Sequence, residues 1–282
     1  MAALRLKEMM KNEGSLPRVP VIGIPVDENS SYKQGAAKGP KIIGERLLGG
    51  GGNPWTETGE DLLEDGVFAY LGLLEKGPNG WFEAIGEAAD RLYSAETNPI
   101  FLGGDHSITF PLVKALAGSV PGLTILHIDA HPDLFDNFES NPHSHASPMA
   151  RIMEGGLAKR LIQIGVRTLT ADLRRQISRF GVECYEMGKP DRLPDLQLEG
   201  PVYLSIDMDG LDPAFAPGVS HREPGGLTTR EVLDLIHACA GHLVAADVVE
   251  YNPRFDISYL TADVAAKLVR ELAGVMLKGL DH

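Results

Sequence analysis

Short, almost uninterrupted apolar runs alternate with helical patterns along most of this 282-residue chain. The runs are Val19–Val26, Ile100–Leu102, Leu123–Ile128, Leu161–Val166, Val202–Ile206 and Leu243–Val249. Strands that are apolar on both faces are typical of sheets covered by helices on both sides. The alternation therefore predicts an α/β fold with a mainly parallel central sheet.

Four segments between or after these runs have the apolar spacing of helices, at about 81–95, 110–117, 229–240 and 262–272. Thr228 stands just before the third segment, and Glu231 follows three residues later, which is a capping-box pattern. No internal repeat or linker divides the chain. We therefore expect a single domain over residues 1–282, with 1–17 as a loosely attached N-terminal segment.

Charge and composition exclude several classes of protein. The net charge of −13 argues against nucleic acids and anionic membranes as partners, because both attract basic surfaces. No apolar run reaches the ~18–20 residues of a membrane span. The first 17 residues are too polar for a signal peptide, and Glu8 and Glu13 are unusual in a transit peptide, so we expect a cytoplasmic protein. Cys184 and Cys239 are too few for a disulfide framework or a cysteine-based zinc site.

Polar clusters follow four of the apolar runs at the point where each run ends. They are GGDHS at 103–107, DAHPD at 129–133, DMDGLDP at 207–213 and EYNP at 250–253. Ligands of open α/β sheets bind at the carboxyl ends of the strands. The four clusters are therefore expected to meet at one edge of the sheet.

The spacing within these clusters indicates a metal site. Asp129 and His131 lie two residues apart, as do Asp207 and Asp209, so each pair can point to the same side of an extended chain. Carboxylates crowded in this way repel one another unless a multivalent cation joins them. The candidate ligands are His106, Asp129, His131, Asp133, Asp207 and Asp209.

Six ligands are more than one ion ordinarily needs, so we expect two ions that share bridging aspartates. Carboxylate and imidazole ligands without thiolate favour Mn²⁺, and Fe²⁺, Co²⁺ or Ni²⁺ are also compatible. Two such ions lower the pKa of a shared water and produce a nucleophile near neutral pH. Each cluster alone has an ordinary alternative, such as a solvated turn for Asp-x-Asp, but four clusters at strand ends favour a metal site.

Together these motifs resemble the signature segments of the ureohydrolases, a family that includes arginases and agmatinases. The matching segments are GGDHS, DAHPD, SIDMDGLDPAFAPG and VVEYNP. Others, among them SHASPMARIMEGG, FGVECYEM and TADVAAKLVREL, are similar to plant-type arginases. The resemblance runs from about residue 19 to 272 and implies an arginase-like three-layer α/β/α sandwich assembled as a homotrimer or homohexamer.

The resemblance also implies how the ligands divide between two Mn²⁺ ions. One ion would be held by His106, Asp129, Asp133 and Asp207. The other would be held by Asp129, His131, Asp207 and Asp209. Asp129 and Asp207 would then bridge the pair.

Two further residues acquire roles from the resemblance. His145 matches a histidine that shuttles protons, and Glu250 matches the glutamate that binds the substrate guanidinium. A guanidinium resists water because it is resonance-stabilised, so a site must supply a nucleophile, hold the cation and protonate the leaving amine. The alternatives are that His145 is a surface histidine and His143 the functional one, or that Glu250 is salt-bridged to Arg254.

The implied reaction is hydrolysis of L-arginine to L-ornithine and urea by a metal-bridging hydroxide, with agmatine or another guanidino compound as the alternative substrate. A third interpretation is a metal-binding subunit without activity, which complete ligand, histidine and glutamate sets disfavour. Asn141 and Thr168 are the residues expected to contact the amino-acid end of the substrate. Phe135 stands where animal arginases carry an asparagine, which leaves the choice of substrate open.

Overall fold

The computed structural model describes residues 16–49 and 53–280, and within them the strands form one 8-stranded sheet. The order of the strands is β2-β1-β3-β8-β7-β4-β5-β6, and every pairing is parallel. They are β1 (Val19–Ile24), β2 (Phe68–Leu73), β3 (Ile100–Gly103), β4 (Thr124–Ile128), β5 (Arg160–Val166), β6 (Glu183–Glu186), β7 (Val202–Asp207) and β8 (Leu243–Val249). The predicted parallel sheet is confirmed.

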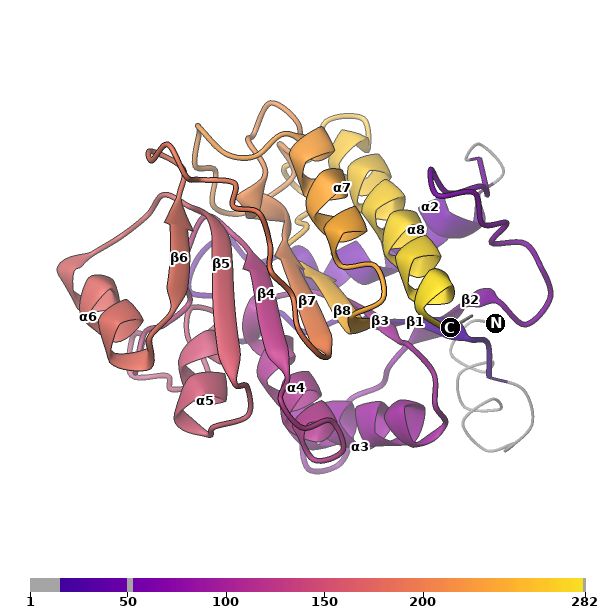
Figure 1. Cartoon of the computed structure of the whole chain (residues 1–282), viewed down its shortest axis with the longest axis horizontal. Coiled ribbons are helices and arrows are strands. Elements are labelled where there is room, and N and C mark those ends of the chain that lie inside the picture. The colour runs from indigo at the N-terminus through magenta and orange to yellow at the C-terminus, as the bar shows by residue number, and fades with distance from the viewer. Residues whose placement is uncertain (1–15, 50–52, 281–282) are drawn as a thin grey trace.

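Helices cover both faces of this sheet, as Figure 1 shows. The helices are α2 (Gly39–Leu48), α3 (Trp81–Ser94), α4 (Thr109–Ala117), α5 (Pro148–Glu154), α6 (Ala171–Phe180), α7 (Thr229–Ala238) and α8 (Leu260–Leu280). One core lies between the sheet and α2, α7 and α8, and a second lies between the other face and α3 to α6. The three-layer α/β/α sandwich is therefore confirmed.

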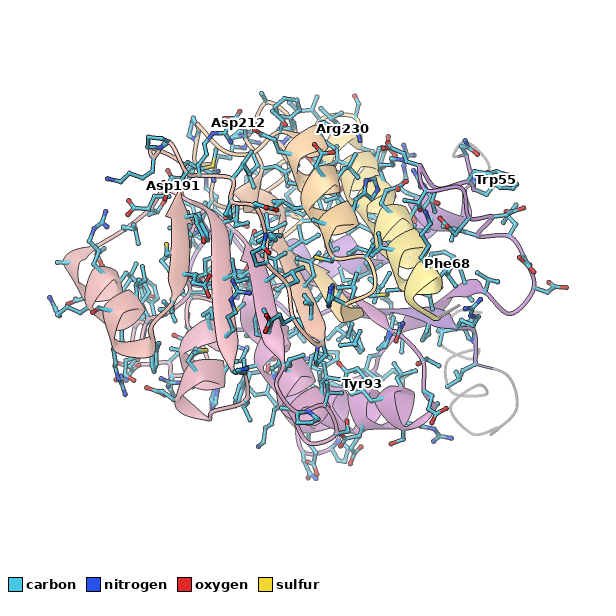
Figure 2. The ribbon with its side chains drawn as sticks, viewed as in Figure 1. Trp55, Phe68, Tyr93, Asp191, Asp212 and Arg230 are labelled. Carbon is cyan, nitrogen blue, oxygen red and sulfur yellow. The ribbon has the colours of Figure 1, made fainter. Side chains whose placement is uncertain are left out.

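Side chains fill the spaces between the sheet and both helical layers (Figure 2). Tyr93 of α3, for example, packs with its ring 6.3 Å from that of Phe101 on β3. In the described part of the chain, no helix has both the length and the apolarity needed to cross a membrane.

The apolar runs located six of the strands and missed β2 and β6, which lie at the two edges of the sheet. An edge strand has one neighbour and need not be apolar on both faces, as the sequence ECYE of β6 illustrates. The four predicted helices are present, and α8 is longer than expected. The capping box at Thr228 and Glu231 is confirmed: Thr228 Oγ1 accepts the Glu231 N–H at 3.1 Å, and Glu231 Oε2 accepts the Thr228 N–H at 2.8 Å.

The predicted N-terminal segment lies outside the described residues except for Leu16 and Pro17, and Leu16 packs against the second core. The order of the strands decides where the functional groups meet. β3, β8, β7 and β4 are consecutive in the sheet, so the four polar clusters lie side by side at its carboxyl edge. Gly104 permits the close approach of the loop after β3, because a Cβ there would lie 1.8 Å from the carbonyl oxygen of Val26.

Candidate functional site

Three carboxylates converge on one nitrogen of His106, which lies in the short helix η2 (His106–Ile108) directly after β3. His106 Nδ1 lies 3.4 Å from Asp129 Oδ2, 3.0 Å from Asp133 Oδ2 and 3.2 Å from Asp207 Oδ2. Asp129 and Asp133 follow β4, and Asp207 ends β7. All four residues are buried.

A second group lies beside the first and shares Asp129 with it. His131 Nδ1 is 3.3 Å from Asp129 Oδ1 and 3.3 Å from Asp209 Oδ2. Asp209 lies in the short helix η3 (Met208–Gly210), where the side chain of Asp207 accepts its backbone N–H at 2.8 Å. The structure therefore brings all six predicted ligands together, in two groups joined by a common carboxylate.

Unpaired buried atoms show that this donor set fits cations. Among the described residues, His106 Nδ1 and Asp129 Oδ2 are buried without a hydrogen-bond partner. Such atoms cost free energy unless something binds them. Two sets of residues each place one ligand atom per residue within 4.8 Å of the others. The first set is His106, His127, Asp129 and Asp133, which includes His127 and not Asp207, and the second is Asp129, His131 and Asp209.

The electrostatics of the second group support the same conclusion. Burial alone would lower the pKa of His131, but the charges of Asp209 and Asp129 raise that pKa to about 12. Burial raises the pKa of Asp209 to about 6, and the charge of Asp129 adds to that shift. The site thus retains protons on groups that would bind metal, and divalent cations would displace them.

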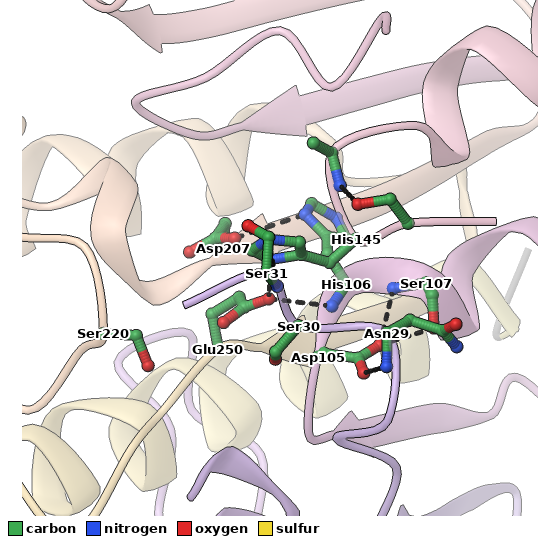
Figure 3. Close-up of polar contacts among 12 residues, drawn as sticks. Asn29, Ser30, Ser31, Asp105, His106, Ser107, His145, Asp207, Ser220 and Glu250 are labelled. Atoms are coloured by element: carbon green, nitrogen blue, oxygen red, sulfur yellow. Dashed lines mark hydrogen bonds and ion pairs between the residues drawn. The ribbon is translucent and has the colours of Figure 1, made fainter. Parts of the chain in front are cut away.

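Next to the candidate metal ligands, His145 and Glu250 form a buried pair (Figure 3). His145 Nδ1 lies 2.9 Å from Glu250 Oε1, and the same oxygen accepts the backbone N–H of His106 at 3.0 Å. On the other side of the ring, His145 Nε2 lies 2.8 Å from Ser31 Oγ and 3.2 Å from the Ser31 backbone nitrogen. Both ring nitrogens are therefore engaged.

This pairing shifts the protonation of both partners. Burial alone would lower the pKa of His145, but the charge of Glu250 raises it to about 9. Burial alone would raise the pKa of Glu250, but His145 holds that pKa below its ordinary value. Glu250 therefore stays a carboxylate at neutral pH. The alternative partner, Arg254, instead donates to the carbonyl oxygen of Gln34 at 3.0 Å.

His143 is placed differently from His145. Its ring packs 5.1 Å from the ring of Phe82 and 5.9 Å from that of Phe110, and its backbone N–H is donated to Asn141. Of the two neighbouring histidines, His145 lines the cavity described below and His143 packs among aromatic rings.

A cavity of about 250 Å³ opens above these groups. Its inner end is lined by His131, Asp133, His145, Asp207, Asp209 and Glu250. Phe135, Phe138 and Thr168, which are half-buried, exposed Thr170, and Leu173 also line the cavity and form its outer part, and Ser31 and His221 are further lining residues. The cavity thus combines a charged inner end with a largely apolar outer wall.

The sequence matches the Arginase family over residues 17–274. The chain belongs to the arginase family. Arginase 1 of rice (Oryza sativa) is 46% identical over 279 residues, which cover 92% of this chain and 81% of the rice protein. The structure of the arginase from Medicago truncatula superposes with a TM-score of 0.85 at 41% identity, covering 98% of this chain and 92% of that one. Agmatinase of Bacillus cereus is 32% identical and covers 90% of both chains. This member of the arginase family is therefore a hydrolase of the ureohydrolase type, and it is similar to plant arginases.

The comparisons overturn the predicted cytoplasmic location. The similar arginases of rice and Arabidopsis thaliana are named mitochondrial, which points to an organelle. The prediction depended on the composition of the first 17 residues, with Glu8 and Glu13, and such a short segment is a weaker indicator of location than similarity over most of the chain.

The two residues expected at the amino-acid end of the substrate are placed differently in this arginase-family chain. Thr168 lines the outer part of the cavity. Asn141 is not among the described residues that line it. Its Nδ2 donates to Asn29 Oδ1 at 3.1 Å, and its Oδ1 accepts the His143 N–H at 2.9 Å. Asn141 therefore supports the loop that carries Ser31.

Three residues of the site escaped the sequence analysis: Ser31, His127 and His221. His127 lies on β4, two residues before Asp129, and this two-residue spacing is the one that separates Asp129 from His131. Ser31 belongs to the polar segment after the first apolar run, another strand that ends at the same edge. His221 lies with its ring 5.7 Å from those of His131 and His145, and nothing in its local sequence indicates this position.

Proposed function

We propose that this member of the arginase family hydrolyses L-arginine to L-ornithine and urea with two Mn²⁺ ions. The observation that carries the proposal is the pair of ligand groups that share Asp129, directly beside the buried His145–Glu250 pair. Similarity favours arginine over agmatine, because the plant arginases match this chain more closely than the agmatinase does.

In this proposal, one ion would be held by His106, Asp129, Asp133 and Asp207, and the other by Asp129, His131, Asp207 and Asp209. When bound, two divalent cations lower the pKa of a shared water and so supply the nucleophile near neutral pH. The short contacts of His106 Nδ1 with Asp129 and Asp207, at 3.4 and 3.2 Å, support the assignment of both aspartates to its ion.

Glu250 is assigned to the guanidinium of the substrate. Its carboxylate is buried, charged at neutral pH, and fixed by the backbone N–H of His106 at 3.0 Å. A fixed, desolvated carboxylate attracts a guanidinium strongly and orients its planar group for attack.

His145 is assigned to the proton that the leaving amine requires. Its Nδ1 faces Glu250, and a pKa of about 9 keeps the imidazole protonated at neutral pH. Ser31 holds the opposite nitrogen and so limits rotation of the ring. A general acid fixed in this way can protonate the amine as the C–N bond breaks.

The described side chains that form the outer part of the cavity include no lysine or arginine that could pair with a substrate carboxylate. Of the described residues, those that line it are apolar side chains and the hydroxyls of Thr168 and Thr170. This observation keeps agmatine, which lacks the α-carboxylate, as a second candidate substrate. We assign recognition of the α-carboxylate of arginine to the hydroxyl of Thr168.

The choice between the two substrates can be measured directly. We expect kcat/KM for L-arginine to exceed that for agmatine by at least about 10²-fold, because agmatine leaves polar groups of the site unpaired. Thr168→Val should reduce that ratio by lowering the rate with arginine. Equal or faster release of urea from agmatine by the unmodified enzyme would reject arginase activity and leave only the ureohydrolase class.

Activity is expected to depend on added divalent metal and to be highest with Mn²⁺, because the proposed ligands are carboxylates and imidazoles. The protein is stripped with a chelator, metals are titrated back, and urea is measured together with bound metal. The dinuclear proposal requires two ions per chain at saturation. Full activity without metal, or saturation at one ion, contradicts it.

The resemblance also supports assembly as a homotrimer or homohexamer. Ile257, Tyr259 and Leu260 are exposed by 61%, 53% and 45% at and just before the start of α8, and oligomers often bury apolar groups of this kind. Light scattering gives the mass in solution.

A further inference from the structure

A row of polar side chains crosses the buried middle of the sheet beneath the metal ligands. Gln163 on β5, His127 on β4, Ser205 on β7 and Asp247 on β8 are neighbours in the strand register. All four are 0% exposed. Parallel strands covered on both faces are usually apolar, and a buried polar group costs free energy unless it is hydrogen-bonded. The row therefore requires an explanation.

Its position relates it to the ligands. His127 precedes Asp129 by two residues, and Ser205 precedes Asp207 by two, so each lies one step below a ligand on the same side of its strand. The row therefore borders the metal site. Two separate chains of contacts, called arms below, connect it to two of the ligands.

The first arm leads from Asp247 through Ser205 to His106. Ser205 Oγ donates its proton to Asp247 Oδ1 at 2.7 Å and lies 2.8 Å from His106 Nε2. Because a hydroxyl has a single proton, Ser205 can only accept from His106. Nε2 of His106 must therefore carry a proton, so Nδ1, which faces the three carboxylates, is the ring nitrogen available to a cation.

The second arm leads from Gln163 through His127 to Asp129. Gln163 Nε2 donates to the carbonyl oxygen of Pro132 at 2.6 Å, which fixes the orientation of the amide. The same nitrogen lies 3.0 Å from His127 Nδ1, so that ring nitrogen accepts. His127 Nε2 then carries the proton, and it lies 2.9 Å from Asp129 Oδ2. His127 thus contacts the shared carboxylate, although the geometry of this contact does not make it a hydrogen bond in the structure.

Asp247, at the end of the first arm, is held by hydrogen bonds from hydroxyl groups. It accepts hydrogen bonds from Tyr203 at 2.6 Å and from Thr109 at 2.8 Å, besides the one from Ser205. Among the described residues no lysine, arginine or histidine forms an ion pair with it. A fully buried carboxylate without a counter-charge is costly. A divalent cation bound at His106 would supply positive charge at the other end of this arm.

We propose that this row positions the metal ligands, with Ser205 and Asp247 orienting His106 and with Gln163 and His127 orienting Asp129. The proposal rests on the dinuclear site of the proposed function. Its physical basis is that a partner on the second nitrogen of a ligating histidine fixes its tautomer and ring orientation and increases its basicity as a ligand.

The test measures metal binding to Ser205→Ala in protein stripped of metal. Free Mn²⁺ is followed by its electron paramagnetic resonance signal during titration, and melting temperatures are recorded with and without Mn²⁺. We expect Ser205→Ala to weaken Mn²⁺ binding by about 10- to 100-fold. We also expect its melting temperature to rise less on addition of Mn²⁺ than that of the wild type.

Tyr203→Phe is the matched control. It removes a hydrogen bond to the same carboxylate, from the same strand and at the same burial, but leaves the Asp247–Ser205–His106 arm intact. Its affinity for Mn²⁺ should stay close to that of the wild type. A folded Ser205→Ala protein that binds Mn²⁺ like the wild type, or an equal loss in Tyr203→Phe, overturns the proposal. If the wild type itself binds no metal, the proposed function fails with it.

A measurement on the wild type covers the case in which Ser205→Ala does not fold. In the Co²⁺-loaded enzyme, the Nε2–H of His106 should give a paramagnetically shifted resonance that exchanges slowly with solvent, because the ring is 0% exposed and the proton is bonded to Ser205. His131, with a side chain 24% exposed, should exchange faster. Absence of a slowly exchanging N–H resonance in the loaded protein overturns the proposal.

Discussion

Asp129→Asn is expected to reduce the turnover of urea by about 10³-fold or more, since loss of bridged metal removes several kcal/mol of transition-state stabilisation. Asp129 belongs to both ligand groups: its Oδ2 lies 3.4 Å from His106 Nδ1 and its Oδ1 lies 3.3 Å from His131 Nδ1. Asparagine keeps the shape but loses the charge and one acceptor oxygen. Both ions should therefore bind more weakly, which titration with Mn²⁺ measures.

His106→Ala is the informative comparison, because His106 contacts the first group only. We expect it to weaken mainly one ion and to leave partial activity. Asp207→Asn should resemble Asp129→Asn, since Asp207 is the second proposed bridge. Retention of both ions and a near-normal rate in either asparagine variant would show that the bridging ligands are assigned wrongly.

His145→Ala is expected to lower kcat by about 10²- to 10⁴-fold, the usual contribution of a general acid, with a smaller change in KM. The pH dependence gives a second readout. Burial alone would lower the pKa of His145, but Glu250 raises it to about 9 without bound cations, and cations nearby would move it downward. His145 is protonated below that pKa, so the wild-type rate should fall as the pH rises through it. The variant should lack this limb.

His143→Ala is the matched control for His145→Ala. Its ring packs against Phe82 and Phe110 and is not among the described residues that line the cavity. We expect its rate and pH profile to resemble those of the wild type. An unchanged pH–rate profile in His145→Ala would remove His145 from the mechanism, and a large loss in His143→Ala would transfer the role to that residue.

Local patterns in the sequence were sufficient for the strands that carry the site. The apolar runs that end at residues 128 and 206 become β4 and β7, and the DAHPD and DMDGLDP motifs follow them directly. Because all strands are parallel, their carboxyl ends meet at one edge wherever each strand lies in the sheet. All six candidate ligands could therefore be predicted without knowing the order of the strands.

The same local patterns did not predict the position of side chains whose contacts join segments far apart in the sequence. The sequence predicts Asn141 as a substrate contact because Phe135 stands where animal arginases carry an asparagine, and in the structure the Asn141 amide is bonded to Asn29, 112 residues away. Ser31 and His221 reach the cavity from loops that the motifs do not include. Side chains of this kind are placed by packing between loops, which local spacing does not record.

The sequence by itself determined the α/β class, the six candidate ligands and the resemblance to ureohydrolases, since each depends on spacing within a few residues. Only the tertiary structure decided that β7 and β8, late in the chain, lie between β3 and β4. That order brings Ser205 beside both His106 and Asp247, residues 99 and 42 positions away. Strand order results from burial of both faces of the sheet by helices far apart in the chain. The partners of the buried polar row therefore become visible only once the chain is folded.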